Sequence, residues 1–171
     1  MYSAPPAEYV STFNVFYMKS ITISAVALRL LLGWYMFFAG IEKVINPEWT
    51  AAGFLSTAKT FPEFYAWFAL PVNAWWVDPL NAWGITLVGV ALLLGVGKRI
   101  APWAGVALMI LYYFPHYVFP TVPHGFIVED HVIYAAAFIL ISLMPEAWEF
   151  SVRNILRNTF IAKIPIVRSL I

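Results

Sequence analysis

Arg29 is the side chain in this sequence that most invites a chemical explanation, because it lies in the middle of the apolar stretch Ile21–Ile41. A guanidinium keeps its proton, so inside a bilayer it must be paired, hydrated or turned toward other protein. Small and charged residues follow Arg29 at helical spacing on one helix face. They are Gly33, Met36, Gly40 and Lys43. This stripe predicts either a helix-packing seam, with Arg29 held by backbone carbonyls, or a site aimed at an anion or a quinone oxygen.

A second set of polar residues surrounds Pro115. Tyr112 and His116 are one helical turn apart and share a face, and a proline inside a membrane helix frees a backbone carbonyl and often opens a cavity. Because an aromatic belt at the membrane surface also explains the tyrosines, both interpretations stay open.

Three ionisable residues in a row, Glu129, Asp130 and His131, begin the last apolar stretch. On a helix they point about 100° apart, so at least one must face the interior of the bundle. Glu129 is expected to cap the helix, whereas Asp130 and His131 are the candidates for function. We expect an inward Asp130 to pair with Lys43, or through water with Arg29.

Other chemistries find little support in the residue types. Cysteine is absent, which excludes disulfides, thiolate metal sites and a cysteine nucleophile. His116, His124 and His131 match no compact metal motif, so no metal is predicted. A phosphate-binding glycine loop and a serine nucleophile elbow are also absent from the sequence.

Composition places these residues in a membrane protein. The chain of 171 residues is 62% hydrophobic and 11% charged, whereas soluble domains average about 45–50% and about 25%. Its formal charge of +1 gives no basic excess for nucleic acid. We therefore predict an all-α integral membrane protein whose environment is membrane lipid.

Four apolar stretches reach the roughly 20 residues that cross a bilayer, at about 21–41, 79–97, 101–119 and 126–144. They predict a four-helix membrane domain over residues 21–144, after an N-terminal segment 1–20 and before a basic amphipathic tail 145–171. The aromatic-rich segment 46–78 is expected to form one or two short interfacial helices, interrupted at Pro62 and Pro71.

Lysines and arginines predict the orientation in a plasma membrane. One side of the predicted domain carries Lys43 and Lys59, whereas the other carries seven basic residues, so both termini are expected to be cytoplasmic. The seven are Lys19, Lys98, Arg99, Arg153, Arg157, Lys163 and Arg168.

The pattern of spans and motifs resembles the DoxX/DoxD family of small membrane proteins. The resemblance covers roughly residues 20–150 and is most specific on the first helix. Its residues are Arg29, Leu32-Gly33, Phe37-Phe38, Gly40 and Lys43, with Asp130-His131 at the start of the last helix.

The DoxD branch, which the length and tail most resemble, implies the membrane subunit of thiosulfate:quinone oxidoreductase. Such a subunit joins two thiosulfates into tetrathionate at the outer face and passes two electrons to a quinone, together with a second small subunit. In that reading Arg29, Asp130 and His131 are catalytic, Lys43, Glu42, His116 and Tyr112 bind substrate, and Trp34 and Tyr35 bind quinone.

A different class of function fits the same sequence. The aromatic segment and the amphipathic tail are suited to docking, so the chain is alternatively a non-catalytic accessory subunit of a larger respiratory complex of the terminal oxidase type. A homo-oligomer is a further expectation, whereas a small transporter or channel is disfavoured because four spans are few and no inverted repeat is visible.

Overall fold

The computed structural model describes residues 7–123 and 125–152, with side chains from residue 15 onward. Expectations for residues 1–6, for His124 and for the tail after residue 152 lie outside the described residues. Helices make up most of the described chain: α1 (Ala7–Val44), α2 (Ala52–Ser56), α3 (Pro62–Phe68), α4 (Pro71–Leu94), α5 (Ala101–His116), α6 (Asp130–Leu143) and the 3₁₀ helix η1 (Pro145–Trp148). The strands β1 (Thr121–Val122) and β2 (Gly125–Phe126) form a small antiparallel hairpin.

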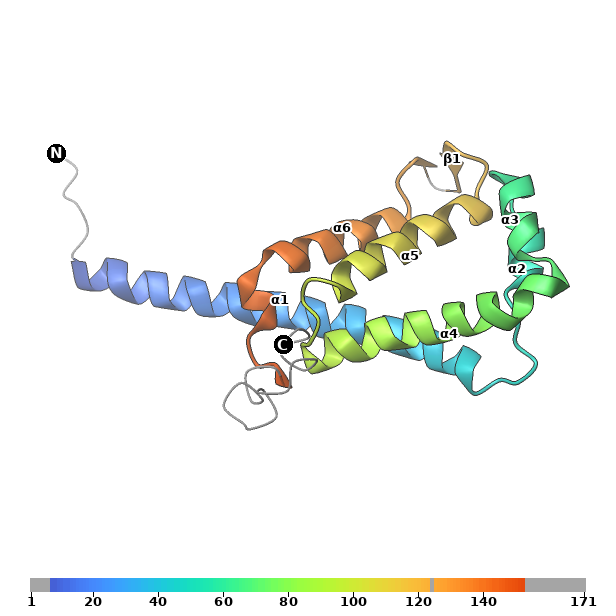
Figure 1. The fold of residues 1–171 in the computed structure, drawn as a ribbon. Coiled ribbons are helices and arrows are strands. Elements are labelled where there is room, and N and C mark those ends of the chain that lie inside the picture. Colours follow the sequence, from blue (N-terminus) through green and yellow to red (C-terminus); the bar gives the residue numbers. More distant parts are fainter. Residues whose placement is uncertain (1–6, 124, 153–171) are drawn as a thin grey trace.

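The four long helices lie lengthwise beside one another, with α1 against α4 and α5 against α6 (Figure 1). The short helices α2 and α3 cross one end of this bundle, where the β hairpin also lies. We call this the α3 end. The opposite end, which we call the η1 end, holds the turn between α4 and α5 together with η1. The N-terminal part of α1 projects beyond the η1 end (Figure 1).

Glycines let α1 and α4 approach to backbone contact. A Cβ added at Gly89 of α4 would lie 2.5 Å from Cα of Phe37 and 2.8 Å from the carbonyl oxygen of Gly33, both on α1. A Cβ added at Gly40 would lie 2.8 Å from Cα of Thr86. Small residues serve membrane helix interfaces in this way, so the glycines predicted as a packing seam do pack the two longest helices.

The helix boundaries differ from those expected from hydropathy, and prolines and glycines explain the differences. Pro62 and Pro71 are the first residues of α3 and α4, where proline is favoured, so α4 begins before the predicted residue 79 and carries Pro79 inside it. Gly95 ends α4 in the left-handed conformation, with φ of 70°. At the other boundaries α1 begins before residue 21 and α5 ends at His116, before the predicted residue 119. The last helix, α6, begins at Asp130 instead of residue 126, where the strand β2 ends.

Two helices in the described part of the chain are long and apolar enough to cross a membrane, namely Val15–Val44 of α1 and Pro71–Leu94 of α4. The apolar helix α6 is shorter. Behind these helices the core is formed by large apolar side chains, such as Met36, Leu92, Phe138 and Ile141. The first residues of the predicted amphipathic tail join this core instead of lying on the surface, since Ala147 and Trp148 of η1 are buried in it.

Candidate functional site

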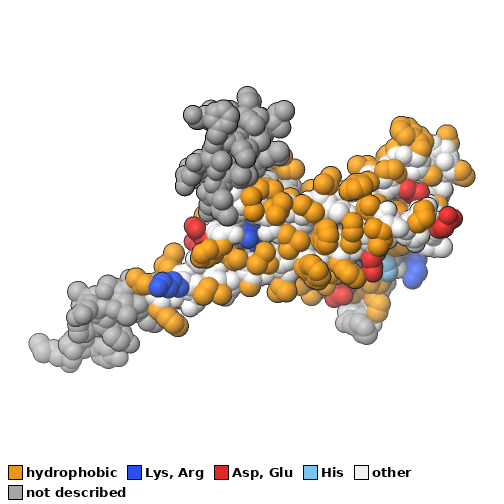
Figure 2. All heavy atoms as spheres, turned by 90° about the horizontal axis from the view of Figure 1, so that it is seen from below, with side chains coloured by type: hydrophobic (Ala, Val, Ile, Leu, Met, Phe, Trp, Pro, Cys, Tyr) orange, Lys and Arg blue, Asp and Glu red, His pale blue; other side chains and the backbone are white. Residues whose placement is uncertain are grey.

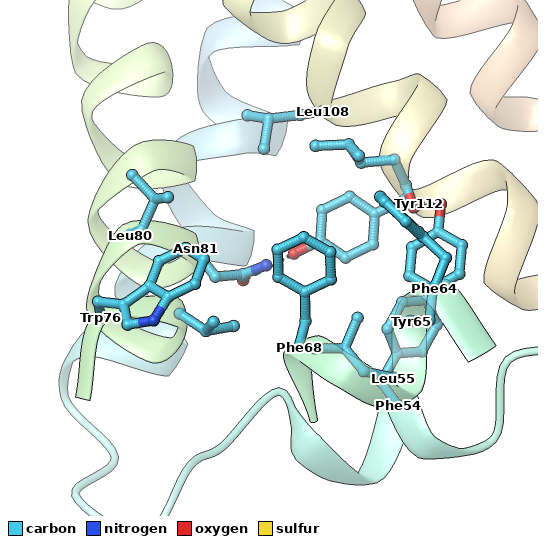
Figure 3. A pocket seen from close by; sticks show the side chains of 12 residues that line it. Phe54, Leu55, Phe64, Tyr65, Phe68, Trp76, Leu80, Asn81, Leu108 and Tyr112 are labelled. Carbon is cyan, nitrogen blue, oxygen red and sulfur yellow. Dashed lines mark hydrogen bonds between the residues drawn. The ribbon is translucent and has the colours of Figure 1, made fainter. Parts of the chain in front are cut away.

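A cavity of about 180 Å³ lies at the α3 end of the bundle, between α4 and α5 and over the short helices α2 and α3 (Figure 3). All twelve residues that line it are uncharged, and most are aromatic or aliphatic. They are Phe54, Leu55, Phe64, Tyr65, Phe68, Trp76, Val77, Leu80, Asn81, Leu108, Leu111 and Tyr112. A largely apolar cavity with few polar groups is the usual form of a site for a small organic ligand.

Asn81 and Tyr112 supply a polar contact in this cavity. The Tyr112 hydroxyl on α5 donates a hydrogen bond to Oδ1 of Asn81 on α4, over 2.7 Å. Both side chains are half-buried. The pair joins the two helices that form the cavity walls, and it offers hydroxyl and amide groups to a ligand.

Tyr65 of α3 fixes the short helices to α5 at the position where Pro115 interrupts the helix. Proline has no N–H, so the carbonyl of Leu111, four residues earlier, loses its helical partner. The Tyr65 hydroxyl donates to that carbonyl over 3.1 Å. One turn further, the carbonyl of Pro115 accepts a hydrogen bond from the backbone N–H of Lys59, at 3.0 Å. Burial raises the pKa of Tyr65, which keeps the hydroxyl protonated as a donor.

We expect Tyr65→Phe to lower the stability of the protein by about 1 kcal/mol, because the hydrogen bond to the part-buried Leu111 carbonyl would be lost. Thermal unfolding in detergent measures the loss. Tyr35→Phe is the matched control, since the half-exposed Tyr35 donates no hydrogen bond to a described residue. Equal melting temperatures for the two variants would contradict this account of the α3 anchor.

Ionisable side chains gather behind Tyr112, on the side facing α6. Glu129 caps α6 by accepting from the backbone N–H of His131 at 3.0 Å, and it also lies 2.8 Å from Nδ1 of the His131 ring. The His131 ring stacks on Tyr112 with centroids 6.4 Å apart and lies 5.9 Å from the ring of His116. The partner of His131 is therefore Glu129, the residue expected only to cap the helix, whereas Asp130 is exposed.

Arg29 lies at the opposite end from this cluster. Its side chain is 1% exposed, contacts Gly95 after α4 and donates a hydrogen bond of 3.4 Å to the Glu149 carbonyl. The guanidinium carbon also sits 5.9 Å from the ring centroid of Trp148. Fourteen residues separate Arg29 from Lys43, which is about 21 Å along a helix. The structure thus does not bring Arg29 together with Asp130 and His131.

The C-terminal end of α4 and the residues just after η1 surround the Arg29 guanidinium. The C-terminal end of α4 carries the negative end of its helix dipole, which favours a cation there. No carboxylate among residues 15–123 and 125–152 forms an ion pair with Arg29. Its Nε and the hydroxyl of nearby Ser151 are buried without a hydrogen bond. The surroundings of Arg29 therefore favour the packing interpretation, in which the backbone holds the guanidinium, over a site open to substrate.

The predicted substrate-binding residues on α1 lie at the α3 end, but outside the cavity. Lys43 donates to the carbonyl of Ala39 at 2.8 Å and lies 5.6 Å from the centroid of the Trp49 ring, while Glu42 is exposed. Within the described part of the chain the ion pair is His131–Glu129, so Lys43 does not pair with Asp130 as expected. No group of three or more histidine or acidic side chains in this part is arranged to hold a metal.

Trp34 and Tyr35, expected to bind quinone, lie on α1 and are 59% and 46% exposed. Neither of them lines the cavity. Tyr35 contacts Tyr134 of α6, with ring centroids 4.9 Å apart. Hydropathy gave no reason to choose between the many aromatic residues. The cavity instead uses aromatic residues of the segment 46–78, expected only to lie at the interface, and Asn81, whose carboxamide inside an apolar stretch was an available signal.

The surface agrees with a membrane environment. Hydrophobic side chains cover most of the long helices on the face shown in Figure 2, and charged side chains gather toward the ends. Exposed large residues such as Ile23, Leu31, Trp83 and Leu87 belong to this apolar cover. Such a continuous apolar surface is unusual for a soluble monomer and suits contact with lipid.

Comparison with known proteins supports the resemblance seen in the sequence. No curated protein and no solved structure matches the chain significantly. A family model described as DoxX matches residues 24–117, which is more than half of the chain and spans α1 from residue 24 onward, the cavity and α5. The chain is therefore a membrane protein of the DoxX family.

Proposed function

We propose that this chain is the membrane subunit of a quinone-linked oxidoreductase and that the quinone ring binds in the cavity at the α3 end. The observation that carries the proposal is an uncharged, aromatic-walled cavity of about 180 Å³ with the Tyr112–Asn81 pair inside it. A quinone needs an apolar slot and hydrogen-bond donors for its carbonyl oxygens. The Nδ2 group of Asn81 makes no hydrogen bond to a described residue and is such a donor.

Reduction of a quinone takes up two electrons and two protons. The Glu129–His131 pair is the nearest set of proton-exchanging groups behind Tyr112, and His116 lies beside it on the exposed side. A carboxylate and an imidazole in contact can pass protons between a site and the solvent. This supports roles for His131 and Glu129, rather than for Asp130 or Arg29, in supplying protons.

The electron donor in this proposal is thiosulfate, as the DoxD resemblance implies. Two thiosulfate ions lose two electrons when a sulfur–sulfur bond joins them into tetrathionate. An uncharged cavity cannot compensate a dianion, so thiosulfate must bind elsewhere. Lys43 lies at the same end, but the carboxylates of Glu42, Glu129 and Asp130 oppose its charge. The second subunit is therefore expected to supply positively charged side chains to the thiosulfate site.

We also propose that α5 and α6 enter the membrane beside α1 and α4, which gives the four-span arrangement with both termini in the cytoplasm of the cell. The 16 residues of α5 and 14 of α6 are about 24 and 21 Å long, less than the roughly 30 Å hydrocarbon layer. Local thinning of the bilayer accommodates this difference.

One observation favours the accessory role as a second candidate. The α1 helix projects past the η1 end of the bundle (Figure 1), and Val15, Phe16 and Met18 near the N-terminal end of its described side chains are exposed. Such a projecting apolar segment is suited to contact with another membrane subunit. This role would be supported instead if the chain copurifies from detergent extracts only with a large oxidase and has no quinone reductase activity of its own.

Substitution of Tyr112 and Asn81 tests the quinone site. We expect Tyr112→Phe and Asn81→Leu to raise the KM for decylubiquinone about tenfold in membranes that hold the chain, its partner and thiosulfate, because a lost hydrogen bond in a binding site is worth about 1–1.5 kcal/mol. Tyr134→Phe, which removes a hydroxyl outside the cavity, is the control. Unchanged kinetics in both cavity variants, or no reduction of decylubiquinone by the wild type, would refute the proposal.

A further inference from the structure

The cavity has exposed apolar residues on three of its walls. Leu80 of α4 is 65% exposed, Leu111 of α5 is 50% exposed and Phe64 of α3 is 53% exposed, although all three line the cavity. By contrast, Tyr65 and Val77 are buried in its walls. The exposed residues mark where the cavity reaches the molecular surface, and we call Leu80, Leu111 and Phe64 the mouth.

The surface beside the mouth is apolar as well. Leu87 and Trp83 of α4 and Ile110 of α5 are each at least half exposed. Two of the three mouth residues, Leu80 and Leu111, belong to the bundle helices α4 and α5, and α4 is long enough to span the membrane. An opening with an uncharged rim and apolar surroundings faces hydrocarbon at a lower free-energy cost than it faces water.

Polarity also changes along the cavity. The Tyr112–Asn81 hydrogen bond provides polar groups, whereas Leu108, one turn before Tyr112 on α5, and Leu80 on α4 add only aliphatic surface (Figure 3). A ligand that satisfies both parts has a polar head and an aliphatic tail. A small polar molecule would leave the leucine surface uncovered.

We propose that the cavity opens sideways into the bilayer and holds a lipid-soluble ligand whose tail passes out between Leu80 of α4 and Leu111 of α5. This inference rests on the proposed function, and it specifies a tailed, membrane-dissolved quinone instead of a water-soluble one. The head lies at Tyr112 and Asn81, and the tail continues into the lipid. Because the rim of the mouth is apolar, the tail can stay in hydrocarbon while the head is bound, and no tail methylene has to be exposed to water.

Filling the mouth with larger side chains tests the path of the tail. For Leu80→Trp and Leu111→Trp we expect the dissociation constant for decylubiquinone, measured on the purified full chain in nanodiscs, to rise about tenfold. The constant for the tail-less head, 2,3-dimethoxy-5-methyl-1,4-benzoquinone, should change little. Leu87→Trp and Ile110→Trp are matched controls, since they enlarge exposed residues of the same helices outside the cavity.

Labelling tests the lipid-facing mouth separately, because the natural chain has no cysteine. A bimane fluorophore on Leu111→Cys is expected to be quenched by brominated lipid chains rather than by iodide in the water, as is the same label on Ile110→Cys. Quenching of the Leu111 label by iodide alone would overturn the sideways opening. Leu80→Trp and Leu111→Trp variants that bind the tailed and the tail-less quinone equally weakly would overturn it as well. Tail-dependent binding without any thiosulfate-driven reduction would support the inference and refute the proposed function.

Discussion

Gly89→Ala is expected to destabilise the protein by about 3 kcal/mol or more, although alanine is the better helix former. The added methyl would lie 2.5 Å from Cα of Phe37 and 2.8 Å from the Gly33 carbonyl oxygen. Both neighbours are backbone atoms of α1, which cannot rotate out of the way as a flexible side chain can. The helices α1 and α4 must therefore separate along their whole contact, which also opens the core around Met36 and Leu92.

Gly84→Ala on the same helix is the matched control, because a Cβ at Gly84 meets no atom within 4 Å. Thermal unfolding in detergent, followed by size-exclusion fluorescence, compares the two variants. The expected order of melting temperatures is Gly84→Ala equal to or above the wild type, and Gly89→Ala well below it. A Gly89→Ala protein as stable as the wild type would show that the contact of α1 and α4 is looser than described.

Arg29→Ala is expected to cause a loss of about 3 kcal/mol in stability while leaving the KM for quinone unchanged in the molecules that remain folded. The side chain fills the space between α1, the end of α4 and η1, where it contacts Trp148 and the Glu149 carbonyl. Removing it leaves a void and weakens the packing of η1 on α1. Because the cavity is at the other end of the bundle, the substitution should not alter quinone binding there.

Arg29→Met separates packing from charge, since methionine restores most of the volume without the guanidinium. We expect it to recover most of the stability lost in Arg29→Ala, because Arg29 has no carboxylate partner among the described residues and its Nε is buried without a hydrogen bond. Melting temperature and quinone kinetics are measured on the same preparations. Full stability combined with lost activity in Arg29→Met would show instead that the guanidinium takes part in the reaction.

The sequence alone was sufficient for the class of protein and for much of its helical framework. A 62% hydrophobic composition and long apolar stretches require a membrane, because so much apolar surface has no other favourable environment. The prolines at 62 and 71 correctly divided the segment before α4 into short helices, since the restraint that proline places on the backbone is local. The motif around Arg29 was also sufficient for the family, which the DoxX match confirms.

The location of the site depended on tertiary structure. Helical spacing shows that Arg29 and Lys43 share a face about 21 Å apart. It does not show that Arg29 packs against η1 and Lys43 beside Trp49. It also could not choose Glu129 over Asp130 as the partner of His131, because that choice depends on how the chain enters α6.

The cavity is the clearest example of a feature that the spacing of residues in the sequence could not predict. Phe54, Tyr65, Asn81 and Tyr112 come from four helices, and no spacing within one segment relates them. They meet because the carbonyl that Pro115 frees on α5 binds Tyr65 of α3, and because Asn81 of α4 faces Tyr112. Local sequence therefore determined which segments become helices and where they stop. Only packing between distant helices decided which polar groups share a cavity, because burial and hydrogen bonding between segments depend on the whole fold.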